Sequence, residues 1–303
     1  MVARLFSSRQ SREDLVFQSI VNIMLVIAGV IALFPLIFVV SASISEPNMV
    51  ASGQVYLMPK GIQFRGYELI FKSKWISIGY RNSLFYTIVG TFFNVAVTFA
   101  AAYGLSRKKL YGRSVLNFIM VFTMWFSGGM IPTFVIVDKL KLIDKPYTLL
   151  ILGMVSVYNM LISRSFINSS IPEELQEAAR MDGSGDFGLF FRIVVPLSTP
   201  VLAVISMFYA LGHWNSYFEG LIYLNIKEYQ PLQIFLREVL VQNQSLTFDF
   251  KDMRQIESEV ERAQTAQVMK YGLCVVASVP MLLLYPFVQR FFVKGVMIGA
   301  LKG

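Results

Sequence analysis

Six uncharged stretches constrain the fold of this 303-residue chain more than any other feature. None of them contains Asp, Glu, Lys or Arg. A helix crosses the roughly 30 Å hydrocarbon layer of a bilayer with about 20 apolar residues. A charged side chain at the bilayer centre costs roughly 2.5–3.5 kcal/mol on insertion scales, so charge-free stretches of this length indicate membrane spans. The stretches are residues 15–45, 82–106, 114–137, 146–163, 193–218 and 271–289.

The composition agrees with a membrane protein. Charged residues make up 15% of the chain, whereas soluble domains have about 25%. Each stretch is continuously apolar and does not alternate with period two, which favours helices. We therefore predict an all-α polytopic membrane protein whose residues 1–303 form one domain with six transmembrane helices. The predicted spans are at about 18–42, 82–106, 114–137, 146–164, 197–223 and 271–291.

The length of the first stretch, the single cysteine, the single histidine and the net charge argue against a secretory signal, a disulfide, a metal site and nucleic-acid binding. The apolar part of the first stretch, residues 20–40, is longer than the core of a secretory signal, so we predict an uncleaved span. Cys274 is the only cysteine and cannot form an intrachain disulfide. His213 is the only histidine and cannot form a metal site alone. The net charge of +8 fits basic loop ends of a membrane protein better than nucleic-acid binding.

The short loops decide the predicted orientation. An even number of spans places both termini on one side, and the total of Lys and Arg does not separate the two sides. The short loop SRKKLYGR at 106–113 contains four basic residues and no acid. The opposing loop DKLKLIDK at 138–145 contains acids as well as bases. Basic short loops face the cytoplasm, so we predict that both termini are cytoplasmic.

A charged segment, EELQEAARMDG at 173–183, lies between the fourth and fifth stretches. Ser170 and Glu173 have the spacing of a capping box. Pro172 falls in the first turn, where its missing N–H costs little. Gly183 follows the last turn, where a left-handed residue is preferred. The segment therefore predicts a short helix on the cytoplasmic side.

The cytoplasmic loop, at about 165–196, is predicted to be a folded knob. A second short helix, capped by Asp186 and extending over 187–195, is expected to follow the first. Ala178 and Ala179 give the first helix a small face that another protein's backbone can approach. The alternative is a helix lying among lipid headgroups. The loop has more acids than bases, which fits an anionic leaflet poorly and favours a protein partner.

The segment EAARMDGSGDFGLFFRIVVPLSTP resembles the EAA loop of ABC importer permeases. The fuller pattern, which includes Asp182, Phe191, Leu197 and Pro200, is similar to the carbohydrate-uptake branch, the relatives of the maltose permeases. The likeness extends over nearly the whole chain, through residues 59–71, 101–113, 213–221 and 291–303. The most similar subgroup of second permease subunits includes importers of oligosaccharides such as the uronic-acid oligomers of alginate. The core of the EAA pattern is matched by Glu177, Ala178, Ala179, Gly183, Ile193 and Pro196.

The resemblance implies an ABC type I importer permease fold and a transport subunit that is not an enzyme. It implies a heterodimer with a second, different permease subunit in the bacterial cytoplasmic membrane. Two cytoplasmic ATPase subunits would bind ATP and Mg, and this chain would bind no cofactor. An extracytoplasmic solute-binding protein would deliver an oligosaccharide. The sequence contains no G-x-x-x-x-G-K-[ST] loop of its own.

The family mechanism gives the knob its role. In such importers the knob, called the coupling helix, docks in a groove on an ATPase, and closure of the ATPase dimer moves the spans. Such a helix must be stiff, so that movement is transmitted and not absorbed. Glu177 would be the main polar contact of the docked helix. The implied ATPase-coupling residues are Glu177, Ala178, Ala179, Asp182, Gly183 and Pro196.

The end of the fifth stretch supplies candidates for the substrate path, because sugars need polar groups and flat aromatic faces. The alternative is an interfacial belt of aromatic residues, or contact with a partner. Amide side chains within the spans are expected mostly to bridge helices, while a few could line the path. The bridging candidates are Asn22, Asn82, Asn94, Asn117 and Asn159. The substrate-path candidates are His213, Trp214, Asn215, Tyr217 and Glu219.

The predicted outer loop, at about 224–270, is expected to be partly helical over 253–270. It would dock a solute-binding protein or, alternatively, form a solvated lid. The resemblance to maltose-type permeases implies a tail that reaches towards the ATPase interface, and the alternative is that Lys294 and Lys302 are simply solvated. Two other functions remain alternatives: a secondary transporter, and an ABC permease for a solute that is not a sugar. The first expects ionisable groups inside the spans for coupling ions, whereas the six uncharged stretches contain one histidine and no acid, lysine or arginine.

Overall fold

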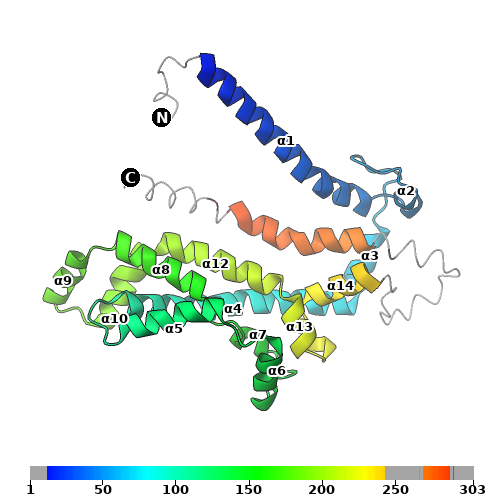
Figure 1. The fold of residues 1–303 in the computed structure, drawn as a ribbon. Helices are drawn as coiled ribbons and strands as arrows, with labels where there is room; N and C mark the ends of the chain where they lie inside the picture. Colours follow the sequence, from blue (N-terminus) through cyan, green and yellow to red (C-terminus); the bar gives the residue numbers. More distant parts are fainter. Residues whose placement is uncertain (1–11, 243–265, 267–268, 287–288, 290–303) are drawn as a thin grey trace. The chain divides into compact units, whose positions relative to one another are not determined.

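The computed structural model describes residues 12–242, 266, 269–286 and 289. All regular structure in these residues is helical (Figure 1), and no β-strand occurs among them. The chain forms two compact units. Of the described residues, 12–72, 266 and 269–275 belong to one unit, and 73–242, 276–286 and 289 belong to the other.

The first unit contains the long apolar helix α1 (Arg12–Ser43), followed by α2 (Pro47–Ala51) and α3 (Arg65–Lys72). The side chains of α1 are exposed along most of its length although they are apolar, which is typical of a helix surrounded by lipid. Phe38 and Tyr271 meet edge to face with ring centroids 5.7 Å apart. The small core of this unit consists of Ala42, Val50 and Val55.

The second unit is a helical bundle centred on α4 (Lys74–Ser106). This helix packs against α5 (Arg113–Trp125), α8 (Val157–Ser170), α12 (Thr199–Trp214) and α14 (Leu232–Gln242). The side chain of Ser73 caps its start by accepting the N–H of Ile76. The main core of the bundle consists of Phe99, Ala102, Leu105, Met160, Ile167, Ile171, Ala179, Leu189, Val194, Val201 and Ile205.

Short helices connect and extend this bundle. Figure 1 shows α9 at one end of the bundle and α13 with α14 at the other, so the two ends carry different structures. The short elements are α6 (Met130–Lys139), α7 (Thr148–Ile151), α9 (Glu173–Met181), α10 (Asp186–Leu189), a π-helix (Phe190–Val194), α11 (Val195–Leu197), α13 (Tyr217–Tyr223) and a 3₁₀ helix (Lys227–Tyr229).

Three helices of the described chain are long and apolar enough to cross a membrane: Glu13–Ser43, Lys74–Ser106 and Met269–Pro286. Two bent helix pairs raise this number to five if each pair is one span. The structure is therefore compatible with the predicted six spans but does not reproduce them as continuous helices. The predicted span boundaries and loop limits stay predictions.

Glycine turns and a bend interrupt the predicted spans. The third stretch breaks into α5 and α6, bent by 113°, because Gly129 has φ 84° and cannot continue a helix. Gly153, with φ 68°, separates α7 from α8 in the fourth stretch. The fifth is bent by 80° between Asp186–Leu197 and Thr199–Trp214. The predicted helix at 253–270 and the tail lysines lie almost wholly outside the described residues.

Candidate functional site

The first candidate site is α9, the charged helix expected from the sequence. It begins directly after Pro172, and no side chain caps its start. The predicted capping box is therefore wrong, because Ser170 is still the last residue of α8. Glu173 and Glu174 occupy the first turn instead, where their carboxylates favour the positive end of the helix dipole.

The end of α9 is closed by backbone hydrogen bonds. Gly183 has φ 80°, which confirms the predicted left-handed residue after the last turn. The N–H of Ser184 donates to the carbonyl of Ala179 at 2.9 Å. Arg180 Nη2 donates to Asp186 Oδ1 at 3.0 Å. Asp186 therefore joins α10 to α9 and does not cap α10, whose N-cap is the preceding residue.

One face of α9 belongs to the core of the bundle, and the rest of the helix is exposed. Ala179 is buried in the main core together with Leu189 of α10. Glu177 and Ala178 are exposed. The predicted small face is therefore divided, since Ala179 anchors the helix and Ala178 remains accessible. Met181 is 88% exposed, so an apolar side chain lies beside the accessible face.

A basic turn contacts the start of α9. Lys108, in the turn 106–113, donates to Glu173 Oε2 at 2.5 Å. This hydrogen bond and the charge of Lys108 lower the pKa of the Glu173 carboxyl, and the same contact raises the pKa of Lys108. Both side chains are largely exposed, so the pair orients the helix more than it stabilises the fold.

A cation–π contact and a tilted ring pair join the same turn to the π-helix that follows α10. Arg107 lies over the ring of Tyr103 at 4.5 Å from its centroid. Tyr103 in turn meets Phe190 of the π-helix at 5.0 Å between centroids. The exposed Pro196 lies in α11, and its carbonyl accepts the Thr199 hydroxyl at 2.7 Å. This proline therefore stands next to the bend that leads into α12.

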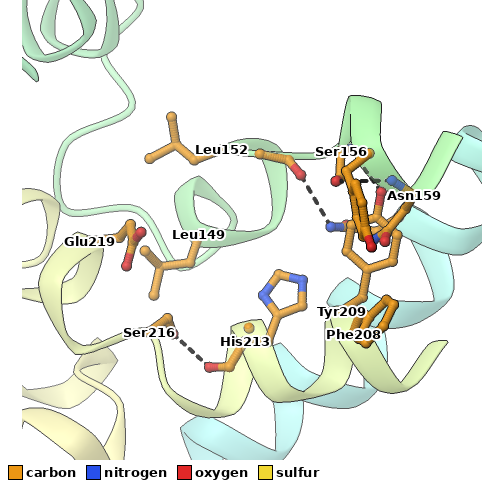
Figure 2. Close-up of a pocket in the computed structure, with 13 residues that line it drawn as sticks. Leu149, Leu152, Ser156, Asn159, Phe208, Tyr209, His213, Ser216 and Glu219 are labelled. Carbon is orange, nitrogen blue, oxygen red and sulfur yellow. Dashed lines mark hydrogen bonds between the residues drawn. The ribbon is translucent and has the colours of Figure 1, made fainter. Parts of the chain in front are cut away.

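The second candidate site is a cavity of about 480 Å³ in the bundle. Figure 2 shows its lining side chains, which come from α4, α7, the α7–α8 turn, α8, α12, the α12–α13 turn and α13. This volume lies within the roughly 300–1,000 Å³ typical of small-molecule sites. The lining residues are Asn94, Leu149, Leu152, Gly153, Ser156, Tyr158, Asn159, Phe208, Tyr209, Gly212, His213, Ser216 and Glu219.

Hydrogen bonds fix the buried side of the cavity. The Tyr209 hydroxyl pairs with the hydroxyl of Thr98 at 2.5 Å. It also accepts the backbone N–H of Ser156 at 2.8 Å, which ties α12 to the start of α8. Asn94 Nδ2 donates to the carbonyl of Gly153 at 3.4 Å, a long contact. Three elements are thus held together around one polar space.

Two buried polar atoms of the cavity lining have no partner within the protein. They are Oδ1 of Asn94 and Nε2 of His213, whose residues are 2% and 7% exposed. Buried polar groups are normally hydrogen-bonded, so an unpaired pair within one cavity needs an explanation. Both atoms are buried, and the Nε2 end of the His213 ring lies against Gly90 of α4, so neither atom is exposed to the open part of the cavity.

The comparisons with known proteins identify the family of the chain. The model of the binding-protein-dependent transport system inner membrane component family matches residues 76–298. The chain belongs to this family. It is thus a membrane permease, a transport component and not an enzyme.

Individual relatives resemble the permease over nearly its whole length. It is 37% identical to the polygalacturonan/rhamnogalacturonan transport system permease protein YtcP of Bacillus subtilis, over 95% of the permease and 98% of YtcP. It is 25% identical to the arabinooligosaccharides transport system permease protein AraQ of the same species, over 97% and 99% of the two chains. It also matches a chain of a crystallised bacterial ABC transporter involved in the import of the acidic polysaccharide alginate. That match has a TM-score of 0.85 and 32% identity, and covers 93% of the permease and 98% of that chain.

The permease brings together only part of the predicted substrate-path group. His213 and Glu219 line the cavity. Trp214 is 2% exposed, and its indole N–H donates to the carbonyl of Ala277 at 2.9 Å. Trp214 is therefore packed inside the helical bundle, and its place on the substrate path stays a prediction. Asn215 and Tyr217 are exposed and are not among the cavity residues.

Of the remaining cavity residues, Asn94 and Asn159 were named from the sequence among the amides that could line the path, and the others were missed. Tyr209, Gly212, His213 and Ser216 follow the i, i+3, i+4, i+7 spacing of one helix face. Extending the polar face from His213 back by one turn would have found Tyr209. The residues of the α7–α8 turn carry no such signal, because only the folded turn brings them to the cavity.

Two of the predicted amide bridges are confirmed in the permease. Asn82 Nδ2 donates to the carbonyls of Glu228 at 2.7 Å and Gln230 at 3.0 Å. Asn117 Oδ1 accepts a hydrogen bond from Arg164 at 2.6 Å, which joins α5 to α8. Within the described residues, no group of three His, Cys, Asp or Glu side chains could hold a metal ion.

Proposed function

We propose that the permease is one of two different membrane subunits of an ATP-driven importer for oligosaccharides. Two relatives support this substrate class, since their names describe polygalacturonan/rhamnogalacturonan and arabinooligosaccharide transport. The structural neighbour comes from a transporter for acidic alginate. Both acidic and neutral sugar chains are therefore represented among the relatives.

The coupling role rests on one observation: one face of α9 is anchored in the bundle core, and the rest of the helix is exposed. Ala179 fixes the helix to the bundle core, while Glu177, Ala178 and Asp182 remain exposed. A partner that moves α9 therefore moves the packed bundle with it, because close-packed interiors transmit displacement. Gly183 ends the helix without a Cβ, so a partner surface can approach the turn closely.

The energy source in this proposal lies in the partners. Two cytoplasmic ATPase subunits bind ATP and Mg, and their closure displaces α9. A solute-binding protein delivers the sugar to the opposite side of the membrane. The basic turn at 106–113 supports a cytoplasmic position of α9, because Lys108 of that turn contacts Glu173. Both termini then lie in the cytoplasm, and the protein resides in the bacterial inner membrane.

Charge reversal at Glu177 tests this coupling role. Glu177→Lys is expected to leave membrane insertion and complex recovery unchanged while abolishing sugar-stimulated ATP hydrolysis. Glu174→Lys is the matched control, because Glu174 is an exposed carboxylate in the first turn of the same helix. It is expected to retain most of the stimulation. Normal stimulation in Glu177→Lys would contradict the assignment of α9 as the docking element.

A further inference from the structure

Two arginines lie at the ends of two charge-free stretches whose helices are neighbours. Arg113 directly precedes the stretch 114–137, and Arg164 directly follows the stretch 146–163. Arg113 is the first residue of α5, and Arg164 lies in α8, which packs against α5. Both residues are half-buried. Arginines near the ends of membrane spans extend their charged groups to the headgroup layer, so both guanidinium groups belong to this layer.

Hydrogen bonds hold the two guanidinium groups in place without neutralising them. Arg113 Nε donates to the carbonyl of Leu105, near the end of α4, at 3.0 Å. Arg164 Nη1 donates to Asn117 Oδ1 at 2.6 Å. Asn117 Nδ2 in turn donates to the carbonyl of Arg113 at 2.8 Å. All these acceptors are neutral, so they orient the two arginines and leave their positive charges uncompensated.

No carboxylate among the described residues forms an ion pair with either arginine. The ion pairs of the described residues join the turn 106–113 to α9, and α9 to α10. The charged group that acts on Arg164 is Arg113, which carries the same sign. Like charges repel most strongly where water is partly excluded. The arginine pair, defined by Arg113 and Arg164, is therefore a site of unbalanced positive charge.

Several N–H donors of the arginine pair are accessible. A guanidinium group carries five N–H donors on three nitrogens. Arg164 Nε is enclosed and unpaired, so it does not face a ligand. Arg164 Nη2 and both Nη atoms of Arg113 have no partner among the described residues, and they are not enclosed. Guanidinium donors bind phosphate oxygens through charge-assisted hydrogen bonds, so these three nitrogens suit a phosphate group.

An apolar surface continues from the arginine pair along α5. None of the residues of α5 is buried. Leu116 and Met124 are exposed, and with Arg113 they follow the i, i+3, i+11 spacing of one helix face. This face is charged where the span begins and apolar further along. A phospholipid has the same order of parts, with a phosphate at the membrane boundary and acyl chains beyond it.

We propose that Arg113 and Arg164 form a binding site for the headgroup of an anionic phospholipid whose acyl chains lie along α5. Anionic lipids are a feature of the cytoplasmic leaflet, and basic sites between membrane helices on that side bind their headgroups. The inference rests on the proposed cytoplasmic position of the turn 106–113. A carboxylate of another subunit is the less favoured occupant, because it would have to leave water for this layer, whereas lipid phosphates are already there.

Lipid binding by the purified complex tests this site. The complete complex is freed of lipid in detergent and titrated with dioleoylphosphatidylglycerol or with dioleoylphosphatidylcholine. Retained lipid is counted by native mass spectrometry. The two lipids share their acyl chains and differ in net charge. The wild-type complex is expected to retain phosphatidylglycerol at lower concentrations than phosphatidylcholine.

Substitution of each arginine assigns the binding to this site. Arg113→Gln and Arg164→Gln are each expected to weaken phosphatidylglycerol binding about fivefold, the effect of one basic residue at an anionic surface. Arg164→Lys keeps the charge but not the planar fork, so it should lose less than Arg164→Gln. Lys109→Gln is the matched control, because it removes the same charge from an exposed residue of the turn 106–113. It should leave binding unchanged.

Four results would overturn the inference. Equal binding of the two lipids by wild type would mean that charge is not recognised. Unchanged binding in both arginine variants would place the lipid elsewhere, and an equal loss in Lys109→Gln would indicate general surface charge. Release of another membrane subunit from the arginine variants, with lipid binding intact, would assign the arginines to a protein partner. If Arg164→Gln does not assemble, Arg113→Gln carries the test. None of these measurements depends on the transported solute, so they are independent of the proposed sugar import.

Discussion

The backbone of Gly90 on α4 lies directly against the imidazole ring of His213 on α12, and a Cβ at position 90 would overlap three ring atoms. The two helices pack closely along this interface. Small residues permit such close approach between helices in membranes. The glycine thus makes room for the one histidine of the chain at the floor of the cavity.

Gly90→Ala is expected to destabilise the permease by about 1–3 kcal/mol, the cost of overpacking a filled interface. Gly104→Ala is the matched control on the same helix, because a Cβ there meets nothing within 4 Å. It is expected to be neutral or to stabilise by up to about 1 kcal/mol, the helix propensity gain of alanine. The midpoint of thermal unfolding of the purified complex, followed by dye labelling of the partly buried Cys274 thiol, measures both.

The His213→Ala variant tests whether the contact between Gly90 and His213 causes the loss of stability in Gly90→Ala. If the ring is what the new methyl group strikes, the double variant Gly90→Ala/His213→Ala should lose less stability than the sum of the two single variants. Additive losses, or equal effects of Gly90→Ala and Gly104→Ala, would show that the Gly90 contact does not limit the packing.

The helical class of the fold follows directly from the sequence, while the helix breaks do not. A long charge-free stretch indicates a segment that is buried or faces lipid, but it does not show whether the helix is continuous. The helices α1 and α4 are continuous, so they could be predicted from the length of their stretches alone. The break between α5 and α6 depends on Gly129 adopting a positive φ. Glycine is also tolerated inside membrane helices, so its presence alone did not predict the turn.

The two candidate sites also differ in how much of each could be predicted from the sequence. Local rules predicted the left-handed Gly183, because helix ends are decided by neighbouring residues. The capping box failed because Ser170 extends α8, a preference that packing of α8 decides. The cavity joins Asn94 to Gly153 and Tyr209 to Thr98. Such contacts between distant segments cannot be derived from the spacing of residues along one chain.

Glu173→Gln tests whether the ion pair with Lys108 stabilises the fold. Because both side chains are largely exposed, the thermal midpoint at neutral pH should change by no more than the error of measurement. The pKa of Glu173 is lowered, so any contribution exists above the ordinary carboxyl pKa and is lost as the pH falls through the lowered value. Unfolding is followed between pH 3 and pH 7 in wild type and variant. A large difference at pH 7 that disappears in acid would contradict the orienting role.

Trp214→Phe is expected to act on stability and not on transport. The indole N–H of Trp214 donates to Ala277, and its ring meets Tyr80 edge to face at 5.7 Å. Loss of the buried hydrogen bond should cost about 1–3 kcal/mol. Trp125→Phe is the control, because Trp125 is 80% exposed and should have little effect. Recovery and thermal midpoint of the complex are measured beside uptake per complex. A reduced uptake at normal stability would instead return Trp214 to the substrate path.

Leucine substitution of Ala178 and Ala179 separates docking from anchoring on α9. Ala179 is buried in the bundle core, so Ala179→Leu should destabilise the permease by about 1–3 kcal/mol through overpacking. Ala178 is exposed, so Ala178→Leu should change stability by no more than about 0.5 kcal/mol. The same Ala178→Leu should weaken docking of the ATPase, because the added side chain stands where a partner backbone approaches. A tenfold loss of ATPase affinity would correspond to about 1.4 kcal/mol.

The two readouts are the thermal midpoint of the isolated permease pair and the retention of ATPase subunits during purification. Ala178→Leu is expected to lower retention at an unchanged midpoint, and Ala179→Leu is expected to lower the midpoint first. Ala178→Ser is the control for the exposed position, since its side chain adds only one oxygen atom and should preserve retention. Full retention in Ala178→Leu would mean that the partner contacts another face of α9. In that case the exposed Met181 of α9 and Phe187 of α10 become the next residues to substitute.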